Sequence, residues 1–184
     1  METKNASLFR TIFGMMMNPA GVLRNALKGT KWYFSIGVSA LAFGLFFIQT
    51  GLDLYKTGQK GFWFVLFCLV LGLLYGMLAI PSFAVVIWLV LKVSKAKTTM
   101  LETISAFCLS YSGALIYGLI GIVFSIVFGW NTSVAFGVTG VLWAIGPMMY
   151  TIRELTGGNH KLSIPVSSLV GVIVLLSWSL LGRF

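Results

Sequence analysis

The sequence predicts an all-α protein: a polytopic membrane bundle of five transmembrane helices preceded by a short amphipathic leader. The first observation behind this prediction is composition, because 58% of the 184 residues are hydrophobic and only 9% are charged. A soluble domain carries about a quarter charged residues, since its surface must meet water. The second observation is that four uncharged stretches exceed the roughly 20 residues that a helix needs to cross a bilayer core.

Residues 1–31 form the predicted cytoplasmic leader, a basic amphipathic segment ahead of a membrane domain at residues 32–184. Apolar residues recur at helical spacing from Leu8 to Met16, which predicts a first short helix. Asn18 then suits a helix N-cap and Pro19 the first helical position, so a second short helix is expected to follow. We expect both helices to lie flat in the headgroup layer. The alternative is that they pack on the protein's own spans.

The uncharged stretches place the five spans at about residues 32–52, 62–91, 104–128, 134–152 and 164–181. The longest stretch, between Glu102 and Arg153, is interrupted by Gly-Trp-Asn-Thr-Ser at residues 129–133 and therefore predicts two spans. The stretch between Lys60 and Lys92 exceeds one span but is too short for two helices and a turn. We interpret it as one long helix kinked at Pro81, because proline removes a backbone N–H and clashes with the preceding turn. A second kink is predicted at Pro147.

The cations predict the orientation in the membrane. Ten of the 13 lie in the leader and in two loops on the same side as the leader, so the N-terminus is expected inside and the C-terminus outside, in the cytoplasmic membrane. Because these cations sit in short segments beside spans, the expected partner is anionic lipid headgroups and not nucleic acid. The membrane-surface cations are Arg10, Arg24, Lys28, Lys31, Lys92, Lys95 and Lys97.

Small residues recur along the third predicted span, mostly at intervals of four. Such residues let helix backbones approach closely in a bilayer, where dispersion holds helices together. We expect them to pack against other spans of the same chain, with dimerisation as the alternative. The strip consists of Ala106, Ser110, Ala114, Gly118, Gly121, Ser125 and Gly129, and Gly72 with Gly76 forms a GxxxG motif in the second span.

Ser110, Tyr111 and Ser112 form the most polar patch inside a span. Hydroxyl groups in a helix can bond to carbonyl groups of the same helix or of a neighbour, so we favour ordinary helix adhesion. The functional alternative is a polar contact beside the kinks at Pro81 and Pro147, in a groove for lipid or peptide.

Catalytic chemistry is not expected, and neither is a cofactor or a metal. The chain has four acidic residues and a single histidine, too few for paired carboxylates, a triad or a zinc site. A membrane-embedded enzyme would depend on Tyr111, Glu102 or Glu154. No ionisable Asp, Glu, Lys, Arg or His falls deep in a predicted span, which argues against a proton-driven carrier. Cys68 and Cys108 lie in apolar runs and are expected to be small buried residues.

The chain resembles the Ypt/Rab-interacting (Yip) family of five-span membrane proteins, in its bacterial-type branch. The resemblance lies in the basic leader with Asn18-Pro19, the Lys31-Trp32 pair that opens the first span, and the Ser110–Ser112 patch followed by a Gly-rich hairpin. It covers nearly the whole chain and implies five helices with a cytoplasmic N-terminus. Eukaryotic members are linked to small GTPases, vesicle budding and membrane shaping, whereas some bacterial relatives accompany transporters. This chain lacks the long hydrophilic N-terminal region of the eukaryotic members, so a small GTPase is a doubtful partner.

These observations lead to one functional expectation and one alternative. We expect a non-enzymatic protein that acts through helix contacts, as an accessory or organising subunit of a membrane transport or trafficking complex. Its partner would be another membrane protein such as a transporter. The alternative is a passive small-molecule transporter or a lipid-handling protein, with the proline kinks and the patch hydroxyls along its path.

Overall fold

The computed structural model describes residues 8–26, 32–94, 96, 98–158 and 160–181, and every regular element in this part of the chain is helical. The predicted all-α class is confirmed, and five helical segments are long and apolar enough to cross a membrane. The chain is therefore a multi-pass membrane protein. Its elements are α1 (Leu8–Met17), α2 (Pro19–Ala26), α3 (Trp32–Lys56), α4 (Phe62–Leu74), η1 (Tyr75–Ala79), α5 (Ile80–Val93), α6 (Met100–Leu109), α7 (Ser112–Val127), η2 (Ser133–Val138), α8 (Thr139–Leu155) and α9 (His160–Leu181).

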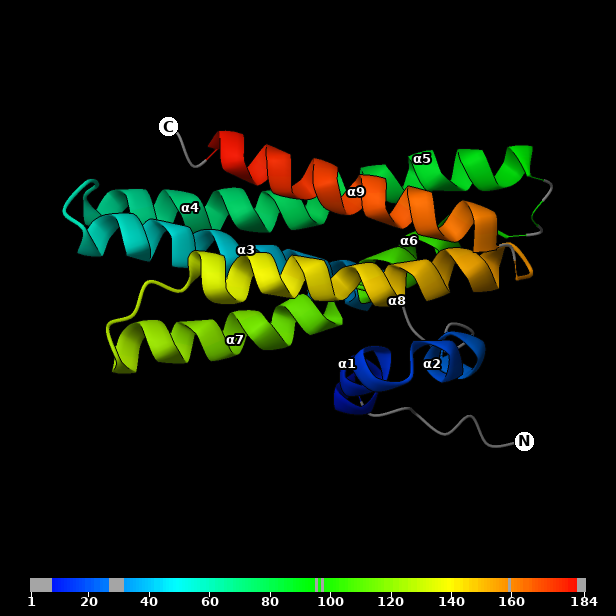
Figure 1. The fold of residues 1–184 in the computed structure, drawn as a ribbon, viewed down its shortest axis with the longest axis horizontal. Helices are drawn as coiled ribbons and strands as arrows, with labels where there is room; N and C mark the ends of the chain where they lie inside the picture. The colour runs from blue at the N-terminus through cyan, green and yellow to red at the C-terminus, as the bar shows by residue number, and fades with distance from the viewer. Residues whose placement is uncertain (1–7, 27–31, 95, 97, 159, 182–184) are drawn as a thin grey trace.

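The five spans run side by side along the long axis of the molecule, with α3 in their midst (Figure 1). Helix α3 packs on α4, α6, α7 and both π-helical turns, η1 and η2. In its most apolar window 67% of the residues are buried, against 28% in the second span and 28% in the fifth. The first span is thus the core of the bundle, and the second and fifth spans form its outer surface.

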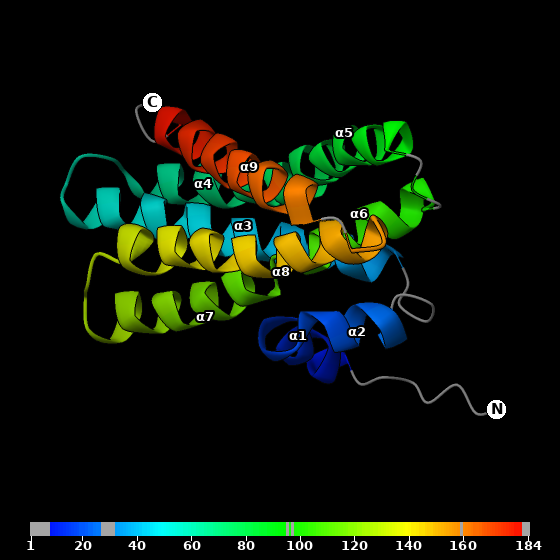
Figure 2. The same cartoon turned by 45° about the vertical axis from the view of Figure 1, so that its right-hand side comes forward.

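The two ends of the bundle differ in what lies beside them. At one end α5 and α8 finish and α6 and α9 begin, and α2 packs on α8 on this side, whereas α1 packs on α7 nearer the middle of the bundle (Figures 1 and 2). We call this the leader end. At the other, the far end, α3 and α7 finish, α4 and η2 begin, and α9 terminates. Because the number of spans is odd, the start of α3 and the end of α9 lie at opposite ends of the bundle.

The second span continues through Pro81 as one segment, Phe62–Val93, and carries a π-helical turn directly before the proline. Pro81 cannot donate a hydrogen bond to the carbonyl of Met77, and a wider π turn is one of the ways in which a helix absorbs such a break. Helix α5 leaves this turn at an angle to α4 (Figure 2). Pro81 therefore stands at a change in the direction of the span, next to a feature that the sequence did not predict.

The third span runs from Met100 to Val127, in agreement with the predicted span at about residues 104–128, but a break inside it divides it into two helices. Helix α6 ends at Leu109 and α7 begins at Ser112. The hydroxyl of Ser112 donates to the Leu109 carbonyl at 2.7 Å, and a side chain that bonds to the backbone in this way competes with the helical ladder. The polar patch is therefore a helix break, and α1 packs on α7 beyond it.

The leader forms the two predicted helices, and Asn18 caps the second by accepting the Gly21 N–H at 3.1 Å. Of the two arrangements that the sequence leaves open, the structure shows packing on the protein's own spans. Met15 is completely buried, and Leu23 belongs to the same core cluster as the spans. Another face of α1 carries Phe9 and Phe13, which are 75% and 53% exposed. The leader therefore presents apolar side chains both inwards and outwards.

Candidate functional site

The small-residue strip of the third span lies inside the bundle. A Cβ atom on Gly118 would stand 2.9 Å from the Cβ atom of Leu45 in α3, and one on Gly121 would collide with the side-chain oxygen of Gln49. Ala106, Ser110, Ala114 and Ser125 are buried as well. These six residues of the strip therefore lie inside the bundle, in agreement with the interpretation that the strip packs against other helices of the same chain. Gly129 departs from the pattern, because it has a φ of 69° in the loop after α7.

The GxxxG pair of the second span faces α3. A Cβ atom on Gly72 would lie 2.5 Å from the Phe43 carbonyl oxygen, and one on Gly76 would collide with the Ser39 carbonyl oxygen and stand 2.6 Å from the Cα atom of Ala40. The Ser39 hydroxyl also donates to the Gly76 carbonyl at 2.8 Å. Glycine is thus required at both positions for the two backbones to touch, and one hydrogen bond joins them.

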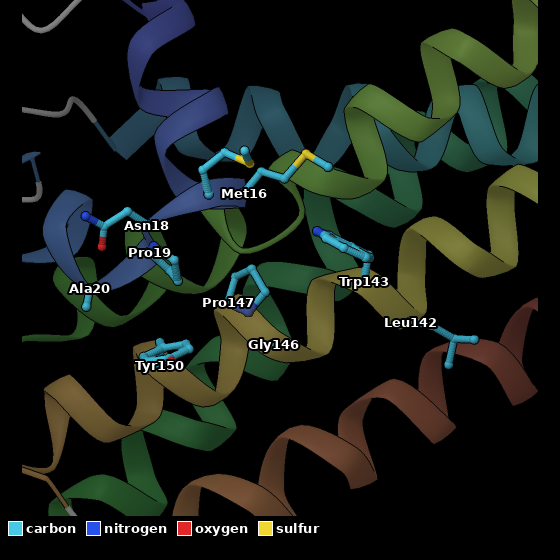
Figure 3. Close-up of a pocket in the computed structure, with 10 residues that line it drawn as sticks. Met16, Asn18, Pro19, Ala20, Leu142, Trp143, Gly146, Pro147 and Tyr150 are labelled. Atoms are coloured by element: carbon cyan, nitrogen blue, oxygen red, sulfur yellow. The ribbon is translucent and has the colours of Figure 1, made fainter.

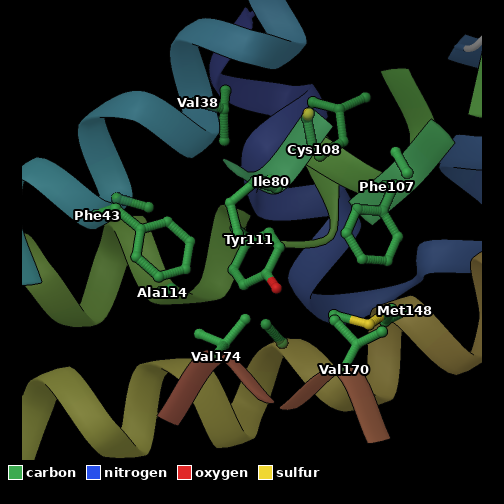
Figure 4. Packing of buried hydrophobic residues seen from close by; sticks show 14 of the residues in the cluster. Val38, Phe43, Ile80, Phe107, Cys108, Tyr111, Ala114, Met148, Val170 and Val174 are labelled. Atoms are coloured by element: carbon green, nitrogen blue, oxygen red, sulfur yellow. The ribbon is translucent and has the colours of Figure 1, made fainter. Parts of the chain in front are cut away.

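The polar patch serves adhesion and not an open groove. Ser110, Tyr111 and Ser112 are all completely buried. The Ser110 and Thr151 hydroxyls lie 3.1 Å apart and link this break to α8. Among the described residues the Tyr111 hydroxyl has no hydrogen-bond partner, and it points toward the apolar side chains of Met148 and its neighbours (Figure 4). The Tyr111 ring packs on Phe43 and Phe107, with centroids 5.0 and 6.0 Å away.

A pair of charged residues at the end of α3 forms a clamp that sequence reasoning missed. The carboxylate of Asp53 accepts the N–H groups of Thr132 and Ser133 at 3.1 and 2.8 Å, where η2 begins. The ammonium group of Lys56 donates to the carbonyl and the hydroxyl of Ser125 and to the carbonyl of Trp130, at 2.6–2.9 Å. This Asp53–Lys56 clamp fixes the loop between the third and fourth spans to the first span at the far end.

Two side-chain hydrogen bonds hold α9 against the bundle. The indole N–H of Trp178 donates to the Thr50 hydroxyl at 3.0 Å, and the hydroxyls of Tyr75 and Ser177 lie 2.6 Å apart. The Trp178 ring is also stacked on Phe46, with 5.0 Å between centroids. These contacts involve only the half of α9 near the far end.

At the leader end a cleft of about 560 Å³ separates the leader from α8 (Figure 3). Pro147, predicted as a helix kink, lies inside α8 and forms part of the wall. A Cβ atom on Gly146 would meet no other atom within 4 Å, so the cleft is open at this position. Its ten lining residues, none of them charged, are Met16, Met17, Asn18, Pro19 and Ala20 from the leader and Leu142, Trp143, Gly146, Pro147 and Tyr150 from α8.

The predicted membrane-surface cations fall partly outside the described residues. Arg10 is exposed on α1, and Lys92 is exposed near the end of α5, with its ammonium group 5.6 Å from the centre of the Trp88 ring. Lys92 lies at the leader end, whereas α1, which carries Arg10, packs on α7. The predictions for Lys28, Lys31, Lys95 and Lys97, and for the side chain of Arg24, concern groups outside the part that the structure describes.

Within the described residues no three His, Cys, Asp or Glu side chains gather where they could hold a metal, and Cys68 and Cys108 are free, buried thiols. No protein-family model, curated protein or solved structure matches this chain. The resemblance to the Yip family therefore stays a prediction. The functional proposal below is based on helix packing, on the cleft and on the outer surface of the bundle.

Proposed function

We propose that this chain is a non-enzymatic, Yip-type accessory or organising subunit of a membrane transport or trafficking complex. The observation that supports this proposal is the uneven burial of the spans. Only 28% of the most apolar window is buried in each of the second and fifth spans, against 61% in the third. The outer faces of α4, α5 and α9 are therefore available to helices of another membrane protein.

The partner would contact large apolar side chains and not the small ones. The small residues of the second and third spans already pack within the chain, so substitutions there would damage folding before they affected assembly. An exposed stripe runs along the outer face of α4 and η1 at helical spacing. This outer stripe consists of Trp63, Phe67, Val70, Leu74 and Leu78. In a bilayer, van der Waals packing of such a face supplies much of the attraction between helices.

The proposal includes the cytoplasmic membrane, with the N-terminus inside and the C-terminus outside. The charges support this orientation. Among the described residues, Lys92, Arg153 and Lys161 are at the leader end, whereas Lys56 and Lys60 are at the far end. Cationic loops are retained on the cytoplasmic side during insertion.

Site-specific photo-crosslinking in intact cells tests the partner surface. Benzoyl-phenylalanine replaces Trp63, Phe67 or Leu74 in the outer stripe, and Val123 or Ile126 on α7 as lipid-exposed controls. We expect one protein to be crosslinked from the stripe and not from α7, and the same protein to copurify stoichiometrically. Crosslinks to lipid alone, or equal protein crosslinks from both helices, would contradict the proposal.

A lipid-handling role is the second candidate, and the cleft beside the leader favours it over a passive transporter. The hydroxyls of Ser110 and Ser112 are buried and donate to backbone carbonyls, which leaves them poorly placed to line a polar path. Purified protein in liposomes would be tested for lipid scrambling and for small-molecule flux. Scrambling without flux would support lipid handling, and the absence of both would contradict this candidate.

A further inference from the structure

We propose that the cleft between the leader and α8 binds one acyl chain of a membrane phospholipid. This inference does not depend on the accessory role, because it concerns a different surface from the outer stripe. It is based on the depth of the cleft, on the chemistry of its lining residues and on the open space at Gly146.

The depth of the cleft determines what can enter it. Its α8 wall runs from Leu142 to Tyr150, which lies within the candidate span Ser133–Leu155. At 1.5 Å per residue, Tyr150 stands about 8 Å and Leu142 about 20 Å from the end of α8. The cleft therefore extends from near the membrane surface into the hydrocarbon region, where lipid takes the place of solvent.

The lining matches a hydrocarbon chain. Tyr150, near the membrane surface, is an aromatic residue of the kind that anchors proteins at the membrane interface, whereas Trp143 lies deeper and offers a large apolar ring. Figure 3 shows Trp143 and Pro147 projecting from α8 toward Met16 of the leader. With no charged lining residue and a volume of about 560 Å³, the cleft falls within the roughly 300–1,000 Å³ typical of small-molecule sites but offers no partner for a headgroup charge.

The leader that forms the other wall exposes an apolar face on its outer side. Phe9, Phe13 and Met17 recur every four residues on the outward face of α1 and are more than half exposed. Met15 and Leu23 hold the leader to the spans from its inward face. The leader thus acts as a wall that is attached to the protein along one side and borders the bilayer on the other, which leaves the cleft accessible to a lipid chain.

Gly146 allows the cleft to be filled without disturbing the fold. Its Cβ position is open, it has no positive φ, and leucine favours helix more than glycine does. The matched control is Gly37→Leu, because Gly37 also lies in a spanning helix with no atom within 4 Å of its Cβ position, but it does not line the cleft. Each methylene displaced from the cleft weakens apolar binding about fourfold, so displacing two or more lowers lipid retention about tenfold or more.

The experiment uses the full chain in nanodiscs that contain phosphatidylcholine or phosphatidylglycerol with a diazirine in the acyl chain. We expect both lipids to label the peptides containing Met16 and Trp143, Gly146→Leu to reduce this labelling about tenfold, and Gly37→Leu to leave it unchanged. Native mass spectrometry after detergent exchange should retain one phospholipid on the wild type and on Gly37→Leu, and none on Gly146→Leu.

Three results would overturn the proposal: labelling that Gly146→Leu leaves intact, an equal loss in Gly37→Leu, or labelling that requires the anionic headgroup. The first two describe ordinary boundary lipid, and the third describes recognition by charge. Thermal unfolding of both variants, followed with a dye that reacts with the buried thiols of Cys68 and Cys108, checks that each variant is folded. Crosslinking from the outer stripe stays intact in Gly146→Leu if the accessory role holds, so the two proposals fail independently.

Discussion

The interface between α3 and α4 and the contact between the leader and α8 are built in opposite ways. At Gly72 in α4 and Gly76 in the adjoining turn η1, the backbone of the second span approaches that of α3 so closely that no Cβ atom fits. Between the leader and α8 about 560 Å³ stays open, and a Cβ atom on Gly146 would touch nothing. Glycine therefore has contrasting effects in the two places: it permits contact in the first and leaves space in the second.

This difference shows how a membrane protein distributes stability. Helices in a bilayer gain little from excluding lipid, so they adhere where close packing and hydrogen bonds exceed what lipid chains offer. The α3–α4 interface meets this condition through backbone contact and the bond from Ser39 to Gly76. Along the cleft, the leader and α8 lack such close packing and hydrogen bonds, and lipid chains would supply the missing contacts. We infer that the first interface fixes the fold and the second adapts to the membrane.

The largest effect is expected from Gly76→Leu. The new side chain would collide with the backbone at Ser39 and Ala40, which cannot move without separating α3 from the second span. Overpacking of a close interface costs about 1–3 kcal/mol and sometimes more, so we expect the variant to unfold at a much lower temperature or not to fold. The measurement is thermal unfolding in detergent, reported by thiol labelling of Cys68 and Cys108.

Gly37→Leu is the control for this prediction, because the same substitution in open space should leave the unfolding temperature unchanged or slightly raised. An unfolding temperature for Gly76→Leu equal to that of the control would show that α3 and α4 are not held by backbone contact. The contrast between the two interfaces would then be lost.

Much of the fold was predictable because its signals are local. Charge-free stretches give the number and approximate limits of the spans, and Asn18 with Pro19 marks the start of α2. The inward orientation of Gly72 and Gly76 was predictable from their spacing, since small residues in membrane helices favour close contact. Each of these features depends on residues within one or two turns of each other.

The features that escaped prediction depend on packing that no local sequence pattern specifies. The Asp53 carboxylate accepts the N–H group of Thr132, which is 79 residues away in the sequence, and no pattern around either residue predicts this contact. The break between α6 and α7 involves Ser112, whose hydroxyl is compatible with a continuous helix until the neighbouring packing selects the alternative. The cleft requires the leader to dock on α8, whereas the basic amphipathic pattern of the leader favoured a position in the headgroup layer over packing on the spans.

A smaller loss of stability is expected at the far end, from Asp53→Ala. The carboxylate accepts two N–H groups at the start of η2, and a hydrogen bond to a charged group contributes about 1.5–3 kcal/mol. Because Asp53 is only partly buried, water can replace part of both bonds, whereas the collision at Gly76 is with backbone atoms and has no such relief. We therefore expect a clear fall in unfolding temperature that stays smaller than that of Gly76→Leu. Hydrogen exchange at Thr132 and Ser133 should accelerate, while exchange at Gly72 should not.

Asp53→Asn is the matched variant, because its side-chain carbonyl can accept one of the two N–H groups. It should lose roughly half as much stability as Asp53→Ala. If both variants unfold like the wild type, the Asp53 carboxylate contributes nothing, and the loop at the far end is held by Lys56 and by the apolar contacts of α7 and η2. The polar component of the comparison would then be reduced to Lys56.

The smallest effect concerns the hydroxyls of Ser110 and Thr151, which join the helix break to the inner side of α8. A single hydrogen bond between membrane helices is worth about 0.6 kcal/mol on average, since the competing states also find partners. A double-mutant cycle with Ser110→Ala and Thr151→Val should therefore yield a coupling near this value by thermal or chemical unfolding. Because this bond lies behind the wall of the cleft, its loss should leave lipid retention unchanged. A coupling several times larger, together with loss of the retained lipid, would mean that the break and the cleft form one unit, and that packing and lipid binding are not separable in this protein.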